Sequence, residues 1–150
     1  MFEVKLINPE MTYSLRHRIL RPNQSIEDCK YSTDHEEGAF HVGAFYKGKL
    51  ISIASFCMEN YHVFPQKVQY RLRAMATVEE FRRKGAGRLV VSFAENILRD
   101  RRVELLWCIG RIDAKGYYEK LGFKPHGEVF DYPPLGPHII MYKQLSKIDD

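Results

Sequence analysis

The chain changes its hydrophobic period at a glycine-containing junction, and this change constrains the fold more than any other feature. Apolar and polar residues alternate from Val68 to Ala76, which predicts a strand over 68–77. From Gly85 onward the apolar residues share one helical face, at Leu89, Val90, Phe93, Ala94, Ile97 and Leu98. A strand therefore runs into an amphipathic helix through Phe81-Arg82-Arg83-Lys84-Gly85-Ala86-Gly87-Arg88.

The residues at this junction are of the types that form an anion-binding site. Glycines there permit positive φ and leave backbone N–H groups uncovered, and the N-terminus of the following helix favours negative charge. Two common phosphate motifs are absent. The third glycine of a dinucleotide fingerprint would fall at Val90, and no Gly-Lys-Ser/Thr follows. From spacing alone, a structural turn and an anion site both stay open.

Charge adds to the anion-site interpretation without settling it. The chain has 23 Lys and Arg against 19 Asp and Glu, a formal charge of +4. Basic side chains gather between 82 and 102, so a phosphate-rich ligand near residue 82 and a solvated basic helix are both open. Most of this charge falls at the helix ends, so we expect no nucleic-acid partner.

Composition limits the class of protein. At 150 residues with 45% hydrophobic side chains, we expect one folded domain over 1–150 rather than a disordered chain. No apolar run reaches the ~20 residues of a membrane span, and the N-terminus lacks signal-peptide features. Cys29, Cys57 and Cys108 are an odd set without C-x-x-C spacing, which indicates reduced thiols. We expect a cytoplasmic protein with no membrane partner and no metal site.

The remaining pattern predicts an α/β (α+β) fold with a mixed sheet. Asn8-Pro9 should start a helix that stops before Pro22, and residues 21–38 read as a long loop or a short helix. Gly122 should end a helix over 114–121. Further strands are expected at 2–7, 40–46, 50–56, 103–109, 124–131 and 137–143.

Two linked motifs resemble those of the GCN5-related N-acetyltransferase (GNAT) family. Arg82-x-x-Gly85-x-Gly87 is similar to the family's Arg/Gln-x-x-Gly-x-Gly/Ala motif. About 30 residues later, Ala114-Lys115-Gly116-Tyr117-Tyr118-Glu119-Lys120-Leu121-Gly122-Phe123 resembles its Ala-x-x-Phe-Tyr-Glu-Lys-Leu-Gly-Phe stretch. Segments 15–20 and 136–141 loosely resemble the ElaA-like branch. The resemblance implies a mostly antiparallel sheet of about seven strands flanked by helices.

The resemblance also implies an activity and a cofactor site. Members transfer an acetyl group from acetyl-CoA to an amine. Strands 68–77 and 103–109 would splay apart, Met75 and Thr77 would pair with the pantetheine arm, and a backbone N–H near Ala76 and Thr77 would polarise the thioester. The pyrophosphate would lie on Arg82, Arg83, Lys84, Gly85, Ala86, Gly87 and Arg88. Thr77, Glu79 and Arg111 depart from the usual family residues.

By the same resemblance, Tyr118 matches the tyrosine credited as general acid toward the CoA thiolate, while a core aromatic is the alternative. The base stays open among Glu128, Asp131, His138 and water. Arg71 and Arg73 could bind an acceptor carboxylate or form structural ion pairs. The acceptor, a small-molecule or peptide amine, is not identified. A homodimer and a non-catalytic acyl-CoA sensor on the same scaffold stay open.

Overall fold

The computed structural model describes residues 1–145, which build around one seven-stranded sheet. The strand order is β1-β2-β3-β4-β5-β7-β6, and every neighbouring pair is antiparallel except β4–β5. This confirms the predicted mixed, mostly antiparallel sheet. The strands are β1 (Glu3–Ile7), β2 (Phe40–Tyr46), β3 (Lys49–Met58), β4 (Gln69–Thr77), β5 (Leu105–Arg111), β6 (Lys124–Asp131) and β7 (Pro137–Gln144).

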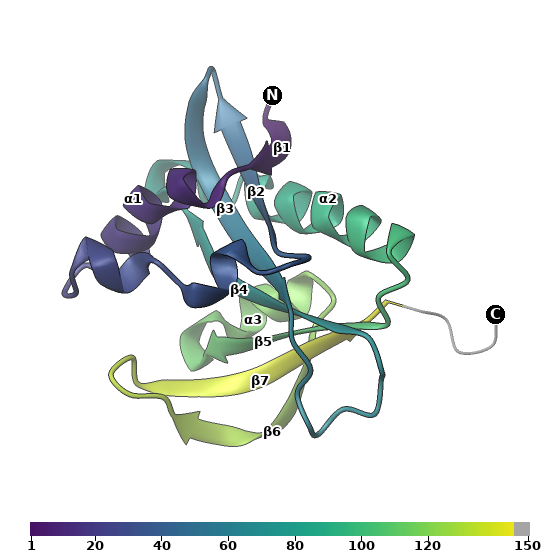
Figure 1. The fold of residues 1–150 in the computed structure, drawn as a ribbon. Helices are drawn as coiled ribbons and strands as arrows, with labels where there is room; N and C mark the ends of the chain where they lie inside the picture. Colours follow the sequence, from purple (N-terminus) through teal and green to yellow (C-terminus); the bar gives the residue numbers. More distant parts are fainter. Residues whose placement is uncertain (146–150) are drawn as a thin grey trace.

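Helices cover both faces of the sheet (Figure 1). The long helix α2 (Ala86–Asp100) and the short α3 (Lys115–Lys120) pack on one face. The N-terminal helical segment around α1 (Tyr13–Leu15) and the turns that follow it pack on the other. Gly122 ends α3 as predicted, at φ 97°, with its N–H donating to the carbonyl of Glu119.

The N-terminal helical segment differs from the regular helix that was expected. Asn8 caps it and Pro9 opens it, but residues Pro9–Thr12 form a 3₁₀ turn and Arg16–Leu20 a π turn, with only α1 between them. The π turn closes when the N–H of Arg21 bonds the carbonyl of Arg16, one residue before Pro22. Residues 21–38 contain two further 3₁₀ turns, Ile26–Cys29 and Ser32–His35.

The strand predicted over 68–77 is confirmed as β4, but a bulge interrupts its alternation in the C-terminal half. Arg73 pairs with Ser55 and Ala76 with Ile53, so Ala74 and Met75 together oppose one residue of β3. Ala74 takes a positive φ of 54°, which marks a β-bulge. The bulge turns the following side chains to the opposite face from the one alternation assigns. Met75 consequently reaches the first turn of α2 beside Gly87.

Strands β4 and β5 separate soon after they meet. Their parallel pairing covers Gln69–Arg71 against Leu105–Trp107 and ends there, although β4 continues to Thr77 and β5 to Arg111. The predicted splay is therefore confirmed. Beyond Arg71, the edge of β4 that faces β5 has unpaired backbone groups, which is the state of an edge strand.

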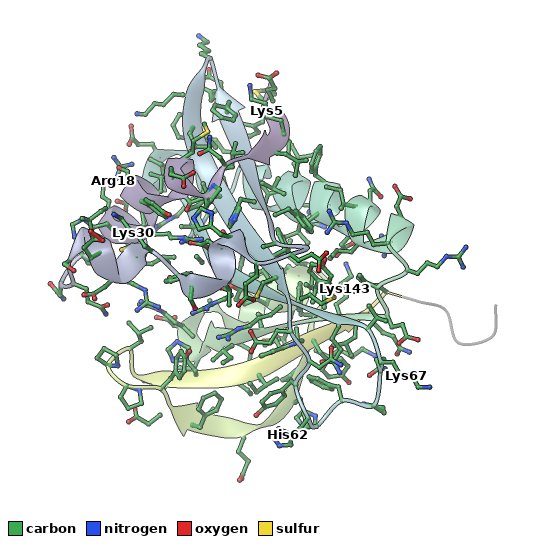
Figure 2. All side chains as sticks on the ribbon, viewed as in Figure 1. Lys5, Arg18, Lys30, His62, Lys67 and Lys143 are labelled. Atoms are coloured by element: carbon green, nitrogen blue, oxygen red, sulfur yellow. The ribbon has the colours of Figure 1, made fainter. Side chains whose placement is uncertain are left out.

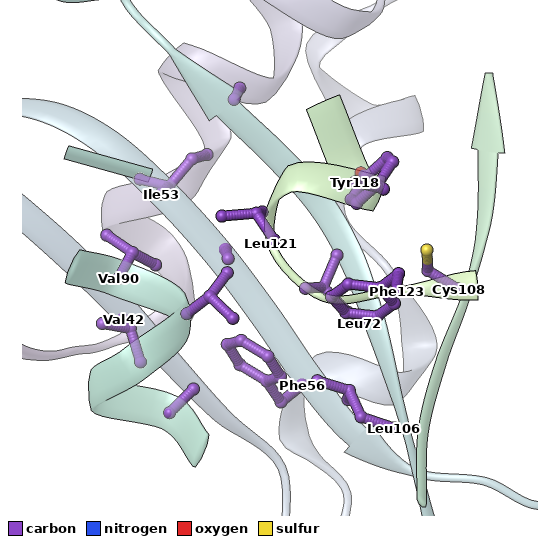
Figure 3. Packing of buried hydrophobic residues seen from close by; sticks show 14 of the residues in the cluster. Val42, Ile53, Phe56, Leu72, Val90, Leu106, Cys108, Tyr118, Leu121 and Phe123 are labelled. Carbon is purple, nitrogen blue, oxygen red and sulfur yellow. The ribbon is translucent and has the colours of Figure 1, made fainter. Parts of the chain in front are cut away.

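The hydrophobic core lies between the sheet and the α2–α3 face (Figure 3). Val42 of β2, Phe56 of β3 and Val90 of α2 are at most 1% exposed. Leu121 and Phe123 extend this cluster from the end of α3 toward β4 and β5. The core thus fixes α3 against the two strands that separate.

A buried ion pair anchors the opposite face. Arg16 is fully buried and donates to both carboxylate oxygens of Asp34, at 2.7 and 2.9 Å. It also donates to the Cys29 carbonyl and to Ser55 of β3. Burial alone would raise the pKa of Asp34, but the hydrogen bond and charge of Arg16 lower it below the usual value. This contact ties the N-terminal segment and residues 26–35 to the sheet.

Asp34→Ala should destabilise the protein by about 3–5 kcal/mol, because it leaves a buried guanidinium without its counter-charge. Urea unfolding at neutral pH measures this. Glu27→Ala is the matched control, since it removes an exposed ion pair with Lys30 and should cost about 0–1 kcal/mol. If both variants lose less than about 1 kcal/mol, the buried pair is not the anchor.

Candidate active site

A cavity of about 150 Å³ opens where β4 and β5 separate. Its walls come from the two strands and from α3, and include Leu72, Ala74, Met75, Cys108, Gly110 and Tyr118. The strand separation, the β4 bulge and the start of α3 therefore meet at one place. Gaps of this kind between strands are where small molecules bind in many folds.

Tyr118 forms one wall of the cavity from α3 (Figure 3). Its side chain packs edge-on to Phe123, with ring centroids 5.6 Å apart, and lies over Gly110, where an added Cβ would come within 3.1 Å of the ring. Burial raises the pKa of Tyr118 well above 10, and nearby Cys108 and Tyr117 add to the rise. The phenol therefore holds its proton at neutral pH. Its hydroxyl makes no hydrogen bond within residues 1–145.

Tyr117, which stands at the phenylalanine position of the second motif, lies beside the glycine turn at the start of α2. A Cβ on Gly87 would overlap the Tyr117 hydroxyl. Gly87 therefore permits close contact between α3 and the N-terminus of α2. Nothing in the spacing of residues 87 and 117 predicts this contact, because it depends on how the two helices pack.

The turn before α2 leaves donors uncovered. Gly85 takes φ 89°, caps the helix without a side chain and has open space where a Cβ would stand. Within the described chain, the N–H groups of Ala86, Gly87 and Arg88 have no acceptor, as expected in a first helical turn. These donors and the dipole of a 15-residue helix fit an anionic group such as a pyrophosphate.

The basic residues of the turn divide into two groups. Arg82 donates through Nε to the Thr77 carbonyl at 3.0 Å, and Arg88 donates to the Lys120 carbonyl at 3.3 Å, so both brace neighbouring elements. Arg83 and Lys84 are exposed and make no side-chain hydrogen bond within residues 1–145. Thr77, unusual for the family, bonds Ser52 through its hydroxyl at 2.8 Å and leaves its backbone unaffected.

Only one of the three candidate acid–base side chains reaches the cavity. Glu128 and Asp131 are exposed on β6, the outer edge of the sheet, and do not line it. His138 of β7 lines the cavity and is 2% exposed. Its Nδ1 lies 2.8 Å from the Gly136 carbonyl, which can only accept, so Nδ1 carries the proton. In neutral His138 the lone pair is then on Nε2, as a base requires.

The two arginines of β4 have different partners. Arg71 forms a structural ion pair, one of its two alternatives, with Glu59 at 3.3 Å. Arg73 has no carboxylate partner within residues 1–145; its polar contact is the Thr33 hydroxyl at 3.5 Å. Both line the cavity.

Other arrangements of reactive groups are structural. Ser55, His41 and Asp34 are neighbours, but His41 contacts the Asp34 backbone carbonyl while the carboxylate binds Arg16. This is not the geometry of a hydrolase triad. The three cysteines are free and buried, and burial raises the pKa of Cys108 to about 12. The described residues hold no cluster suited to a metal ion. No described helix is long and apolar enough to cross a membrane.

Comparison with known proteins identifies the family. The sequence model described as the acetyltransferase (GNAT) family matches residues 6–123. The chain belongs to this family. The uncharacterized N-acetyltransferase YitI of Bacillus subtilis (strain 168) is 53% identical over 145 residues, which cover 97% of each chain. The chain is accordingly a GNAT-type N-acetyltransferase.

Solved structures share the fold at low sequence identity. Escherichia coli ElaA has a TM-score of 0.72 at 16% identity and covers 95% of this chain and 99% of its own. An aminoglycoside 6'-N-acetyltransferase complexed with coenzyme A has a TM-score of 0.76 at 17% identity and covers 99% of both chains. These likenesses bear on the fold alone. They agree with a GNAT architecture over nearly the whole length.

Proposed function

We propose that this GNAT protein transfers an acetyl group from acetyl-CoA to an amine inside the cavity between β4 and β5. One observation carries the proposal. Met75 lines the cavity together with Tyr118, and its side chain also lies beside Gly87 in the glycine turn that begins α2. A phosphate-ended thioester laid along this path, from the turn past Met75, would bring its acyl end to the cavity.

Each part of the path has a role that its chemistry supports. Backbone donors of residues 83–88 bind the pyrophosphate, with charge from Arg83 and Lys84. Met75 and Thr77 offer main-chain groups to the pantetheine arm, as in strand addition. When bound, acetyl-CoA supplies an activated acyl group. A backbone N–H beside the bulge, near Ala76, stabilises the charge that develops on the thioester oxygen.

Proton transfer falls to two side chains. His138 Nε2, or a water beside it, accepts the proton of the attacking amine, because its tautomer leaves that lone pair free. Tyr118 donates its proton to the departing sulfur. Burial raises the pKa of Tyr118, and the same dry surroundings raise the proton affinity of a thiolate, so the transfer between them stays feasible.

Tyr118→Phe should lower kcat by about 10- to 1,000-fold, because it removes the acid and keeps the ring that packs on Phe123. Thiol release from acetyl-CoA over a broad amine panel measures this, with CoA affinity by calorimetry expected to be unchanged. Because the pKa of Tyr118 is raised, wild-type kcat should show no alkaline decline up to about pH 9.

Tyr142→Phe is the matched control, since Tyr142 packs among Phe64 and His126 away from the cavity. Full kcat in Tyr118→Phe with chemistry rate-limiting would make Tyr118 an aromatic wall only. Binding of CoA without release of thiol for any amine would instead support the acyl-CoA sensor.

His138→Gln should also reduce kcat, by about 10- to 1,000-fold, because it removes the nitrogen lone pair that accepts the proton of the amine. Glutamine keeps a polar group that can donate to the Gly136 carbonyl, so the variant removes the base and not the hydrogen bond. His126→Gln, on the exposed edge strand β6, is the matched control. Full kcat in His138→Gln, measured with chemistry rate-limiting, would assign acceptance of the proton to water.

A further inference from the structure

The acceptor side of the cavity is lined by an excess of positive charge. Four arginines line it, and no Asp or Glu does: Arg21, Arg71, Arg73 and Arg111. They come from the segment after α1, from β4 and from the end of β5. Chain folding has therefore gathered these charges from three separate segments.

Three of these arginines are already held by the protein. Arg71 pairs with Glu59 and stacks on Trp107, with its guanidinium carbon 5.1 Å from the ring centroid. Arg21 donates to the Tyr31 hydroxyl at 3.1 Å. Arg111 donates to the Leu20 carbonyl at 2.9 Å and joins β5 to the N-terminal segment. These contacts position the side chains, but only Arg71 gains a counter-charge from residues 1–145.

Arg73 is oriented and its charge is unbalanced. Its guanidinium lies over the Tyr31 ring at 4.2 Å, which fixes its plane. Its one polar contact among residues 1–145, with Thr33 at 3.5 Å, is at the limit for a hydrogen bond. Burial, and then the nearby charge of Arg71, lower the pKa of Arg73, as expected for a desolvated cation without a partner. A bound anion would relieve this cost.

The position of Arg73 relates it to the reaction. It immediately precedes the bulge at Ala74 and lines the same cavity as Tyr118. An anion held by Arg73 would therefore lie in the cavity where the proposed acetyl transfer takes place. A cavity of about 150 Å³ holds a group about the size of benzene, so it suits an acceptor whose buried part is small.

We propose that the cavity selects small amines that carry a carboxylate, with Arg73 binding that carboxylate and the amino group directed to the thioester. This inference rests on the proposed acetyl transfer. Guanidinium and carboxylate match in a planar, bidentate fashion, which gives orientation as well as affinity. With four arginines and one carboxylate, the cavity stays positive and favours the neutral, nucleophilic form of the amine. Polyamines and other polycations are excluded by the same charge.

Matched acceptor pairs test the inference. L-leucine is compared with isoamylamine, and L-phenylalanine with 2-phenylethylamine, because each pair differs only by the carboxylate. We expect kcat/KM to be about 10- to 100-fold higher for the carboxylate-bearing member, as a charge-assisted hydrogen bond predicts. A preference for the decarboxylated amines overturns the inference and leaves acetyl transfer standing. So does a preference for phosphoethanolamine over every carboxylate-bearing amine.

Variants assign the selectivity to Arg73. Arg73→Gln should abolish the preference within each pair, and Arg73→Lys should retain part of it because charge stays and the planar fork is lost. Arg18→Gln is the matched control, since Arg18 is exposed on the outer surface (Figure 2). Its ratio should equal that of the wild type. An unchanged ratio in Arg73→Gln overturns the assignment.

A binding measurement that needs no catalytic turnover separates this inference from the proposed function. N-acetyl-L-leucine and N-acetyl-isoamylamine are titrated into the CoA-saturated protein by calorimetry. The carboxylate-bearing product should bind about 10- to 100-fold more tightly, and Arg73→Gln should remove the difference. Equal binding overturns the inference even if no amine is acetylated. Tight carboxylate binding without turnover keeps it and rejects acetyl transfer.

Discussion

The short parallel pairing between β4 and β5 is the constraint on which the rest of the molecule depends. Three residue pairs join the strands at one end, and the core beneath α3 holds the other ends in place while they diverge. Backbone groups along the free edge of β4 lose their sheet partners, and such groups are costly unless water or a ligand takes them. The cavity, the wall formed by Tyr118 and the approach to the glycine turn all follow from this separation.

Structural features that depend on residues close together in the sequence could be predicted. The change of period at Gly85, the helix end at Gly122 and the hairpin of β2 and β3 each depend on neighbouring residues. The paired motifs predicted the family, and the splay followed from it. Features that arise from packing could not be predicted. The bulge at Ala74 does not disturb the alternation of apolar and polar residues in the sequence. The extra residue changes the backbone φ and the strand register, and neither change requires a particular residue type.

Contacts between residues far apart in the chain also could not be predicted from the sequence. Arg16 and Asp34 lie 18 residues apart in a stretch that reads as a helix and a polar loop, and nothing local shows that their charges are buried together. Arg71 and Arg73 look equivalent on β4, yet within the part of the chain that the structure describes only Arg71 forms an ion pair with a carboxylate. His138, Glu128 and Asp131 became distinguishable only when the sheet order placed β7 inside and β6 at the edge.

The central claim is that CoA lies along the turn of α2 and the free edge of β4. Hydrogen exchange of assigned backbone amides, measured by NMR with and without saturating CoA, tests it most directly. The account predicts slower exchange on binding for residues 85–88 and for β4 residues between 72 and 77, with little change on β1 and β6. Tight binding of CoA that leaves exchange in both segments unaltered would contradict it.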